Sequence, residues 1–256
     1  EAGACDDLIL ARPYLLGLEA APPAGVEFGY LLFYREGQPV GKAVLQFVDF
    51  AAADHIKAQR EAGGNGGLSE LMKRTLAQCL QYRVLVCGNM LFTGEHAYAF
   101  DRRLIGEEAA LCLLERSLDR LAVQGEELTG PVDAVLIKDV RASRQRTAAF
   151  FASHAYHRIA FQPNMILDLL PAWRSLPDYL DSLTSKYRVR ARRAFKKARG
   201  VERRLLSTAE VEALEPRLYE LYRAVADDAE FNMLTLHPRY LSTLQRQLPD
   251  RFRVTA

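Results

Sequence analysis

The chain has 256 residues, of which 49% are hydrophobic and 26% are charged, with 34 Lys and Arg against 32 Asp and Glu. This composition is typical of a globular protein and excludes a disordered, fibrous or collagen-like chain. At about 100 to 200 residues per domain, the length allows one large domain or two smaller ones. The sequence has no apolar run of the roughly 18 to 20 residues that a membrane span needs, and no basic and apolar signal segment at its start.

The first elements in chain order predict a short helix followed by a β-hairpin. The expected elements are a helix at 13–20 and strands at 28–35 and 40–50. Residues 51–67 are rich in Ala, then polar, then rich in Gly, and we interpret them as a mobile insertion. Phosphate binding is the alternative, but no Lys-Ser or Lys-Thr follows the glycines as a P-loop requires.

Helices and strands then alternate along the chain. The expected helices are 68–80, 106–123 and 147–154, and the expected strands are 83–89, 97–101, 132–140 and 159–169, the last interrupted at Pro163. This alternation predicts an α/β fold with a mixed sheet that is covered by helices on both faces.

Residues 186–204 hold ten basic side chains and a single acidic one, Glu202. Outside this segment the chain has 24 basic and 31 acidic side chains, so the positive charge is concentrated in one stretch. Such a block favours an anion-facing surface that binds a phosphate-rich ligand. A solvated helix face is the alternative.

The same region has the pattern of a long amphipathic helix. Apolar residues recur at three- and four-residue spacing over 176–199, which predicts one helix with a narrow apolar stripe. Ser175 and Asp178 form a capping-box pattern, Pro177 suits the first turn, and Gly200 stands where a C-cap is expected.

The segment after this helix is short. We expect a strand at 201–206, helices at 210–227 and 237–248, and the beginning of a strand at 251–256. These elements are too few for a second domain of the size of the first, so we expect a further part of the protein to follow Ala256.

The four cysteines are Cys5, Cys79, Cys87 and Cys112. They form no Cys-x-x-Cys pair and have no histidine at metal-ligand spacing, so we expect neither a metal site nor a disulfide framework. Reduced thiols are typical of a cytoplasmic protein, and we expect that localisation. Each cysteine is interpreted as a small buried apolar residue, with a reactive thiol as the alternative.

Arg103-Leu104-Ile105-Gly106-Glu107 follows a predicted strand and precedes a predicted helix. This turn, and the order of the elements, resemble the GNAT superfamily of acyl-CoA N-acyltransferases, which carry an Arg/Gln-x-x-Gly-x-Gly/Ala turn that holds the CoA pyrophosphate on backbone N–H groups. The resemblance implies a GNAT-like fold, acyl-CoA such as acetyl-CoA as co-substrate, and cofactor binding by Arg103 and Gly106. Glu108 stands where the family has a small residue.

Residues 178–188 read Asp-Tyr-Leu-Asp-Ser-Leu-Thr-Ser-Lys-Tyr-Arg and are followed by Arg190, Arg192, Arg193, Lys196 and Lys197. This segment resembles the Tyr-Leu-x-x-Leu-Ser/Thr-x-Lys-x-Arg start of the basic helix in Fem-type peptidoglycan aminoacyltransferases and related bacterial GNAT-like proteins. Stretches 86–89, 93–96 and 162–165 resemble the same group. The resemblance implies two GNAT-like lobes in tandem, the first over 1–174 and an incomplete second one, with the basic helix, over 175–256.

The residues expected to bind substrate or phosphate are Lys186, Tyr187, Arg188, Arg192, Lys138 and Arg141. The last two belong to a cluster in which Lys138 and Asp139 end a buried strand and lead into Arg141, Arg144 and Arg146. We expect this cluster and the basic helix to face one cleft between the lobes. A salt-bridged strand end is the alternative.

N-acyl transfer needs a neutral amine, a polarised carbonyl group and a proton donor for the leaving group. Glu95 and His96 are the expected catalytic pair, because they follow a strand beside a flexible glycine, where α/β sites tend to open. A loop histidine beside a surface glutamate is the alternative. A second polar group, Tyr222, Asp227, Asp228, Asn232 and His237, offers no spacing that selects a base.

These observations favour an N-acyltransferase that takes its acyl or aminoacyl group from acyl-CoA or aminoacyl-tRNA. The acceptor would be an amine on a small or nucleotide-linked molecule, and the resemblance implies cell-wall precursor metabolism. Two alternatives stay open: a non-enzymatic module that binds nucleic acid or phosphate, and a catalytically inactive GNAT-like partner domain. The residues leave the donor, the acceptor and the oligomeric state open.

Overall fold

The computed structural model describes residues 7–51, 81–124, 130–141, 143–159, 165–229, 232 and 234–256. The chain divides into two compact units, one of Glu1–His157 with Leu206–Val254 and one of Arg158–Leu205 with Thr255–Ala256. The Gly-rich insertion expected near residue 63, the helix expected at 68–80, and Cys5, Cys79 and Pro163 lie outside the described residues.

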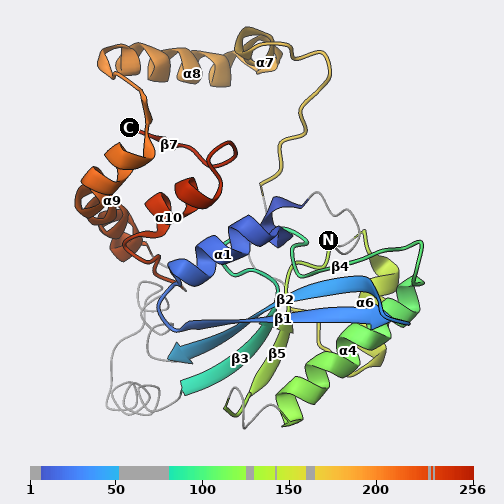
Figure 1. The fold of residues 1–256 in the computed structure, drawn as a ribbon. Coiled ribbons are helices and arrows are strands. Elements are labelled where there is room, and N and C mark those ends of the chain that lie inside the picture. Colours follow the sequence, from blue (N-terminus) through green and yellow to red (C-terminus); the bar gives the residue numbers. More distant parts are fainter. Residues whose placement is uncertain are drawn as a thin grey trace, which may run out of the picture. The chain divides into compact units, whose positions relative to one another are not determined.

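A mixed five-stranded sheet forms the centre of the first unit (Figure 1). The antiparallel strands are β1 (Val26–Arg35), β2 (Gln38–Ala51) and β3 (Gln81–Cys87), in that order; β5 (Ala134–Ile137) pairs parallel to β3, and β4 (Tyr98–Phe100) pairs antiparallel to β2. The turn between β1 and β2 places Glu36 and Gly37 at φ 51° and 78°, as a type I′ hairpin requires. The predicted α/β class and mixed sheet are confirmed.

Helices pack against this sheet and against one another. The helices before residue 158 are the 3₁₀ helix η1 (Leu8–Leu10), α1 (Arg12–Ala20), α4 (Glu107–Gln124) and α6 (Gln145–Ser153). On one side, α4 buries Leu114 and Leu118 against Leu45 and Leu85 of the sheet. Val26, Val48 and Val86 form a separate cluster from the same strands. The two clusters follow from strand alternation, because successive side chains of a strand point to opposite faces.

The last part of the chain contains β6 (Leu205–Leu206), α9 (Thr208–Asp228), α10 (Tyr240–Gln247) and β7 (Val254–Thr255). Residues Leu206–Val254 belong to the first unit, whereas Leu205 and Thr255 are assigned to the second. Ser207 and Glu210 form a complete capping box at the start of α9. Helix α10 lies closely against α1, since a Cβ at Gly17 would be 2.7 Å from a Leu244 methyl carbon. The division into lobes at residue 174 stays a prediction.

In the second unit, the expectation of a single helix over 176–199 is wrong. The structure has α7 (Leu176–Ser182), α8 (Ser185–Lys197) and a 3₁₀ turn η3 (Ala198–Gly200), with extended backbone at Leu183 and Thr184 between the two helices. The hydroxyl of Ser182 donates to the Tyr179 carbonyl, and Thr184 takes the N-cap position of α8. Ser and Thr favour helix ends because their hydroxyl groups compete for backbone partners.

The helix ends follow the sequence signals only in part. Ser175 is the N-cap of α7 and accepts from the Asp178 N–H, while Pro177 lies in the first turn, as predicted. Gly200, the expected C-cap, instead ends the 3₁₀ turn, and Ala198 is the C-cap of α8.

The strand expected at 159–169 is also wrong within the described residues. Ile159 and residues 165–170 are not in a strand, and the side chains of Met165 and Ile166 are 97% and 81% exposed. Alternating apolar residues form a strand when one of its faces packs on a core, and the apolar side chains of this segment pack on no core.

In the parts of the chain that the structure describes, no helix is both long and apolar enough to cross a membrane.

Candidate functional site

The predicted catalytic residues lie where β3 and β5 end. Cys87 and Ile137 are the last registered pair of these parallel strands, and the Lys138 N–H donates to the Cys87 carbonyl at 3.0 Å. Gly88 has φ 141°, and a Cβ there would lie 2.8 Å from the Cβ of Lys138. Only glycine allows the two strand ends to approach so closely. Carboxyl ends of adjacent parallel strands are a common place for α/β binding sites.

Lys138 and Asp139 hold the loop that follows β3. The Lys138 ammonium donates to the Phe92 carbonyl at 2.7 Å and forms an ion pair with Asp139. A carboxylate oxygen of Asp139 accepts from the Gly94 N–H at 2.9 Å. Asp139 has φ 59°, a left-handed conformation that Asp tolerates. The salt-bridged strand end that was the alternative interpretation of Lys138 and Asp139 is therefore present, and it positions residues 92–94.

Glu95 lies between two arginines from the segment after β5. Its carboxylate oxygens are 3.3 Å from Nε of Arg141 and 3.3 Å from Nε of Arg144. The Glu95 side chain is 26% exposed, whereas Arg141 and Arg144 are 69% and 51% exposed. The structure thus joins two predicted groups, Glu95 and the basic cluster, in one ion-paired network whose outward side is basic.

His96 pairs with a residue that the sequence did not single out. Its Nδ1 lies 2.7 Å from a carboxylate oxygen of Asp7, and both side chains are largely buried. The other oxygen of Asp7 accepts from the Ile9 N–H at 2.9 Å, so the carboxylate is also the N-cap of η1. A carboxylate at Nδ1 favours the tautomer in which Nδ1 carries the proton and Nε2 keeps its lone pair.

Gly94 lies close against that Nε2 atom. Its φ is 133°, and a Cβ at this position would lie 2.6 Å from Nε2 of His96. A side chain at residue 94 would therefore collide with the imidazole ring. The glycine therefore permits both this backbone conformation and the close approach of the imidazole ring.

Buried polar side chains hydrogen-bond to the start of the loop that follows β3. The Asn89 side chain donates to the Tyr14 hydroxyl at 3.0 Å and accepts from the Leu91 N–H at 2.9 Å. Gln46 accepts from the Met90 N–H at 2.8 Å. Burial raises the pKa of Tyr14 far above its usual value, so its hydroxyl stays neutral. These bonds hold the start of the loop rigidly, as a functional site requires.

The turn expected to bind CoA is engaged in ion pairs of its own. The Arg103 guanidinium contacts the Asp101 carboxylate at 3.0 and 2.7 Å, and this contact lowers the pKa of Asp101 to about 2. Arg102 lies 3.2 Å from Glu107 in the first turn of α4. Gly106 is exposed at the start of that helix. An incoming phosphate would have to compete with these carboxylates for the arginines.

The remaining predicted residues, Lys186, Tyr187, Arg188 and Arg192, all lie on α8 in the second unit, and no residue of this helix is buried. Asp181 of α7 accepts from Arg188 at 3.5 Å and lies 4.0 Å from Arg192. The guanidinium of Arg190 lies 5.8 Å from the ring centre of Tyr187. The predicted exposed basic helix surface is present, and ligand binding by it stays a prediction.

No protein-family model matches the chain, and no curated protein matches its sequence. A crystal structure of FemX resembles the chain with a TM-score of 0.46 and 15% sequence identity. The alignment covers 95% of this chain and 50% of the FemX chain, so this chain spans about half the length of that protein.

Proposed function

We propose that the protein is an N-acyltransferase of the GNAT or Fem-like type, which transfers an acyl or aminoacyl group from acyl-CoA or aminoacyl-tRNA to an amine. The observation that carries the proposal is the pairing of His96 with Asp7 at the carboxyl ends of β3 and β5, beside the arginines that hold Glu95. The resemblance of residues 178–188 to Fem-type proteins supports it and is the reason for proposing a cell-wall precursor as the acceptor.

His96 is the proposed general base. Nε2 takes a proton from the acceptor ammonium, and the neutral amine then attacks the carbonyl carbon of the donor. The bond to the leaving thiolate or ribose oxygen breaks, and the leaving group takes up the proton that Nε2 holds. The nitrogen that has attacked releases its second proton to solvent as the amide forms. Asp7 keeps Nδ1–H in place and stabilises the imidazolium form. General base catalysis of this kind contributes about 100- to 10,000-fold in rate.

Arg141 and Arg144 are the proposed anion-binding groups of this site. Each contacts Glu95 through Nε, and both side chains are more than half exposed. Their Nη donors can contact donor phosphates or the oxyanion of the tetrahedral intermediate. Glu95, bound between two guanidinium groups, is assigned a positioning role rather than that of the base.

The test compares His96→Gln with His157→Gln, a matched change at an exposed histidine. Transfer from acetyl-CoA, longer acyl-CoAs and aminoacyl-tRNA to a UDP-linked peptidoglycan precursor is measured together with the thermal midpoint. We expect His96→Gln to lower kcat at least about 100-fold at an unchanged midpoint, and His157→Gln to leave kcat unchanged. Equal activity of both variants would contradict a catalytic role for His96.

A non-enzymatic anion-binding module is the second candidate. It is favoured by the exposed basic surface of α8 and by the ion pair that engages Arg103. This candidate predicts that RNA or a phosphate-rich ligand binds with strong salt dependence, and that acyl donors do not raise the thermal midpoint. A donor-dependent rise in the midpoint would instead support the transferase.

A further inference from the structure

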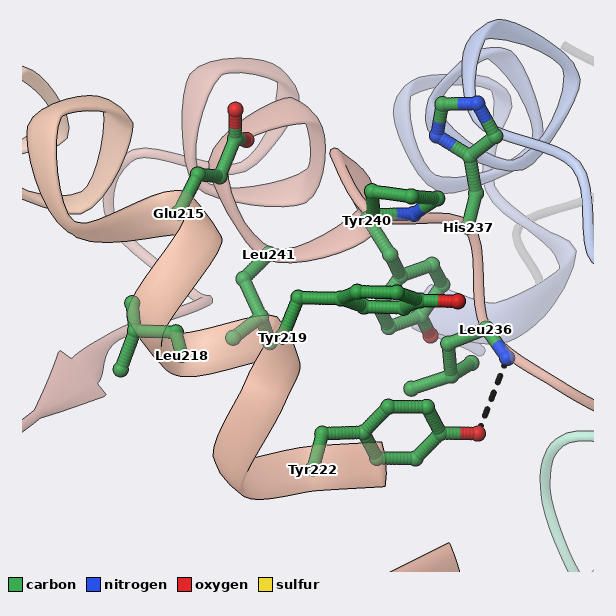
Figure 2. Close-up of a pocket in the computed structure, with 9 residues that line it drawn as sticks. Glu215, Leu218, Tyr219, Tyr222, Leu236, His237, Tyr240 and Leu241 are labelled. Carbon is green, nitrogen blue, oxygen red and sulfur yellow. Dashed lines mark hydrogen bonds between the residues drawn. The ribbon is translucent and has the colours of Figure 1, made fainter. Parts of the chain in front are cut away.

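A small cavity lies between α9 and α10 in the first unit (Figure 2). Its volume is about 70 Å³ and its lining is mainly apolar. Tyr222 and His237, two members of the polar group noted in the sequence, both line it, and the Tyr222 hydroxyl accepts from the Leu236 N–H at 2.9 Å. The Glu215 carboxylate points away from the tyrosine rings (Figure 2). We interpret this cavity as part of the packing between the two helices.

Strand β1 forms one edge of the central sheet, because among the described residues its only ladder partner is β2. Its ten residues include neither lysine nor proline, the residues that commonly keep a sheet edge from pairing with another chain. The side chains of Tyr30, Leu32 and Tyr34 share one face and are 38%, 60% and 59% exposed. A long edge strand with exposed apolar side chains is a template for a further strand.

The hydrogen-bonding groups on the outer side of β1 belong to its even-numbered residues. Val44 of β2 is the ladder partner of Tyr30, and its N–H donates to the Ala97 carbonyl at 2.9 Å, which lies away from β1. In an antiparallel ladder, pairs that exchange hydrogen bonds alternate with pairs that do not. Phe28, Tyr30 and Leu32 therefore direct their N–H and C=O groups outward from the sheet.

The sequence of β1 is complementary to itself when two copies of the strand run antiparallel. In a two-fold arrangement centred on Leu31, Glu27 of each copy lies opposite Arg35 of the other. Tyr30 then lies opposite Leu32, so residues with outward-directed backbone groups meet each other. Opposite charges that face each other directly, and aromatic side chains that face aliphatic ones, stabilise an antiparallel pair.

Other registers lose this match. Moving the centre by one residue places Glu27 opposite Phe33 or opposite a residue beyond the end of the strand. A centre between two residues would place each outward-directed residue opposite one that bonds to β2, so the two strands could not form a ladder. The centre at Leu31 satisfies both the backbone groups and the charges.

We propose that two copies of this chain pair antiparallel along β1 and join their sheets into one, with Glu27 of each copy opposite Arg35 of the other. The Glu27 side chain is 64% exposed, and one of its oxygens contacts Arg83 of its own chain at 2.8 Å. A carboxylate has two oxygens that accept, so the second one can bind the guanidinium of the other copy. The pairing does not depend on acyl transfer, because the quantity that tests it is the oligomeric state.

Two charge reversals test the proposed register in the full chain. Glu27→Arg and Arg35→Glu each place like charges opposite one another, so each should weaken dimerisation about ten-fold or more. An equimolar mixture of the two variants places opposite charges at both positions and should dimerise like the wild type. Arg116→Glu, an exposed change on α4, should leave dimerisation unchanged.

Sedimentation velocity over a concentration series of about 1 to 100 µM measures these dimers, and the thermal midpoint of each variant shows that it is folded. A wild type that stays monomeric throughout would mean that something other than a second copy covers β1, and it would overturn the proposal. A dimer that neither reversal weakens, or a mixture of folded variants that does not recover, would overturn the pairing of Glu27 with Arg35.

A cysteine at the centre of the pair gives a second test that needs no charge change. Residue 31 would face its own copy at a Cα separation of about 4.5 Å, and disulfides form at separations of about 4.4 to 6.8 Å. Leu31→Cys should give a disulfide-linked dimer on mild oxidation. Gln38→Cys, at the exposed start of β2, and the wild type with its own cysteines should cross-link far more slowly. Equal cross-linking of all three proteins would contradict the two-fold pairing at Leu31.

Discussion

Nδ1 of His96 lies 2.7 Å from a carboxylate oxygen of Asp7, 89 residues earlier in the chain. The pair joins the segment before η1 to the loop after β3. It orients the imidazole ring and determines which ring nitrogen carries the proton. The same Asp7 caps η1 through its second oxygen, so one carboxylate links a helix start to the candidate base.

Asp7→Asn tests this relationship. Asn is as good an N-cap as Asp, so η1 should keep its cap and the thermal midpoint should change little. The side-chain amide can present an N–H to Nδ1 and so favour the other tautomer, with the proton on Nε2. We expect kcat for acyl transfer to fall about 10- to 100-fold, with a changed pH profile. Unchanged kinetics in this variant would remove Asp7 from the mechanism.

Gly94→Ala tests the close approach of residue 94 to Nε2. Ala at φ 133° is strained, at a cost of about 1 to 3 kcal/mol, and its Cβ would collide with the imidazole ring. Gly37→Ala is the control, because Gly37 has φ 78° and a Cβ there would have no atom within 4 Å. Both variants should lose stability in chemical denaturation, and only Gly94→Ala should also lose activity. Full activity of Gly94→Ala would show that Nε2 is not used.

The pair of Asp101 with Arg103 predicts a pH dependence of stability. The folded pKa of Asp101 is lowered from 3.8 to about 2, first of all by the hydrogen bond from Arg103. A lowered folded pKa stabilises the fold above the unfolded pKa, and this stabilisation is lost as the pH falls through the folded pKa. Asp101→Asn should therefore melt below the wild type near neutral pH, and the difference should shrink toward pH 2. A constant difference across this range would argue against the ion pair.

Arg188→Ala with Arg192→Ala tests the basic surface of α8. Both side chains are near Asp181, where surface ion pairs are worth under about 1 kcal/mol, and Arg188 also donates to the Leu183 carbonyl at 3.1 Å. The thermal midpoint should therefore fall only by the small amount that losing this one hydrogen bond causes. Donor or acceptor binding should weaken strongly and lose part of its salt dependence. Arg116→Ala with Arg217→Ala, two exposed arginines outside α8, makes the same change in charge and should leave binding unchanged. Equal losses of binding in both double variants would mean that only net charge matters.

Local sequence patterns predicted much of the fold. The apolar spacing of α4, the hairpin of β1 and β2 and the cap at Ser175 were all predicted, since each depends on residues within a few positions of one another. The same local rules failed at Leu183 and Thr184, where periodicity continued through a break. The spacing of apolar residues indicates which face of a helix can pack against another element. It does not indicate whether the backbone stays helical throughout.

The candidate site was predicted only in its separate parts. Glu95 and the residues from Lys138 to Arg144 were singled out as two groups, and nothing in the sequence indicated that Arg141 and Arg144 would hold Glu95. Asp7 was missed because an acidic residue before a short helix has no feature that distinguishes it from an ordinary cap.

By itself, the sequence determined the α/β class, the order of most elements and the concentration of positive charge between residues 186 and 204. These properties follow from composition and short-range periodicity, which depend only on residues that are close together in the sequence. Only the tertiary structure decided which charges pair, that Asp7 meets His96, and that α9 and α10 enclose a tyrosine-lined cavity. Such contacts depend on strand register and on close approaches such as that at Gly88, which bring together residues that no local pattern connects.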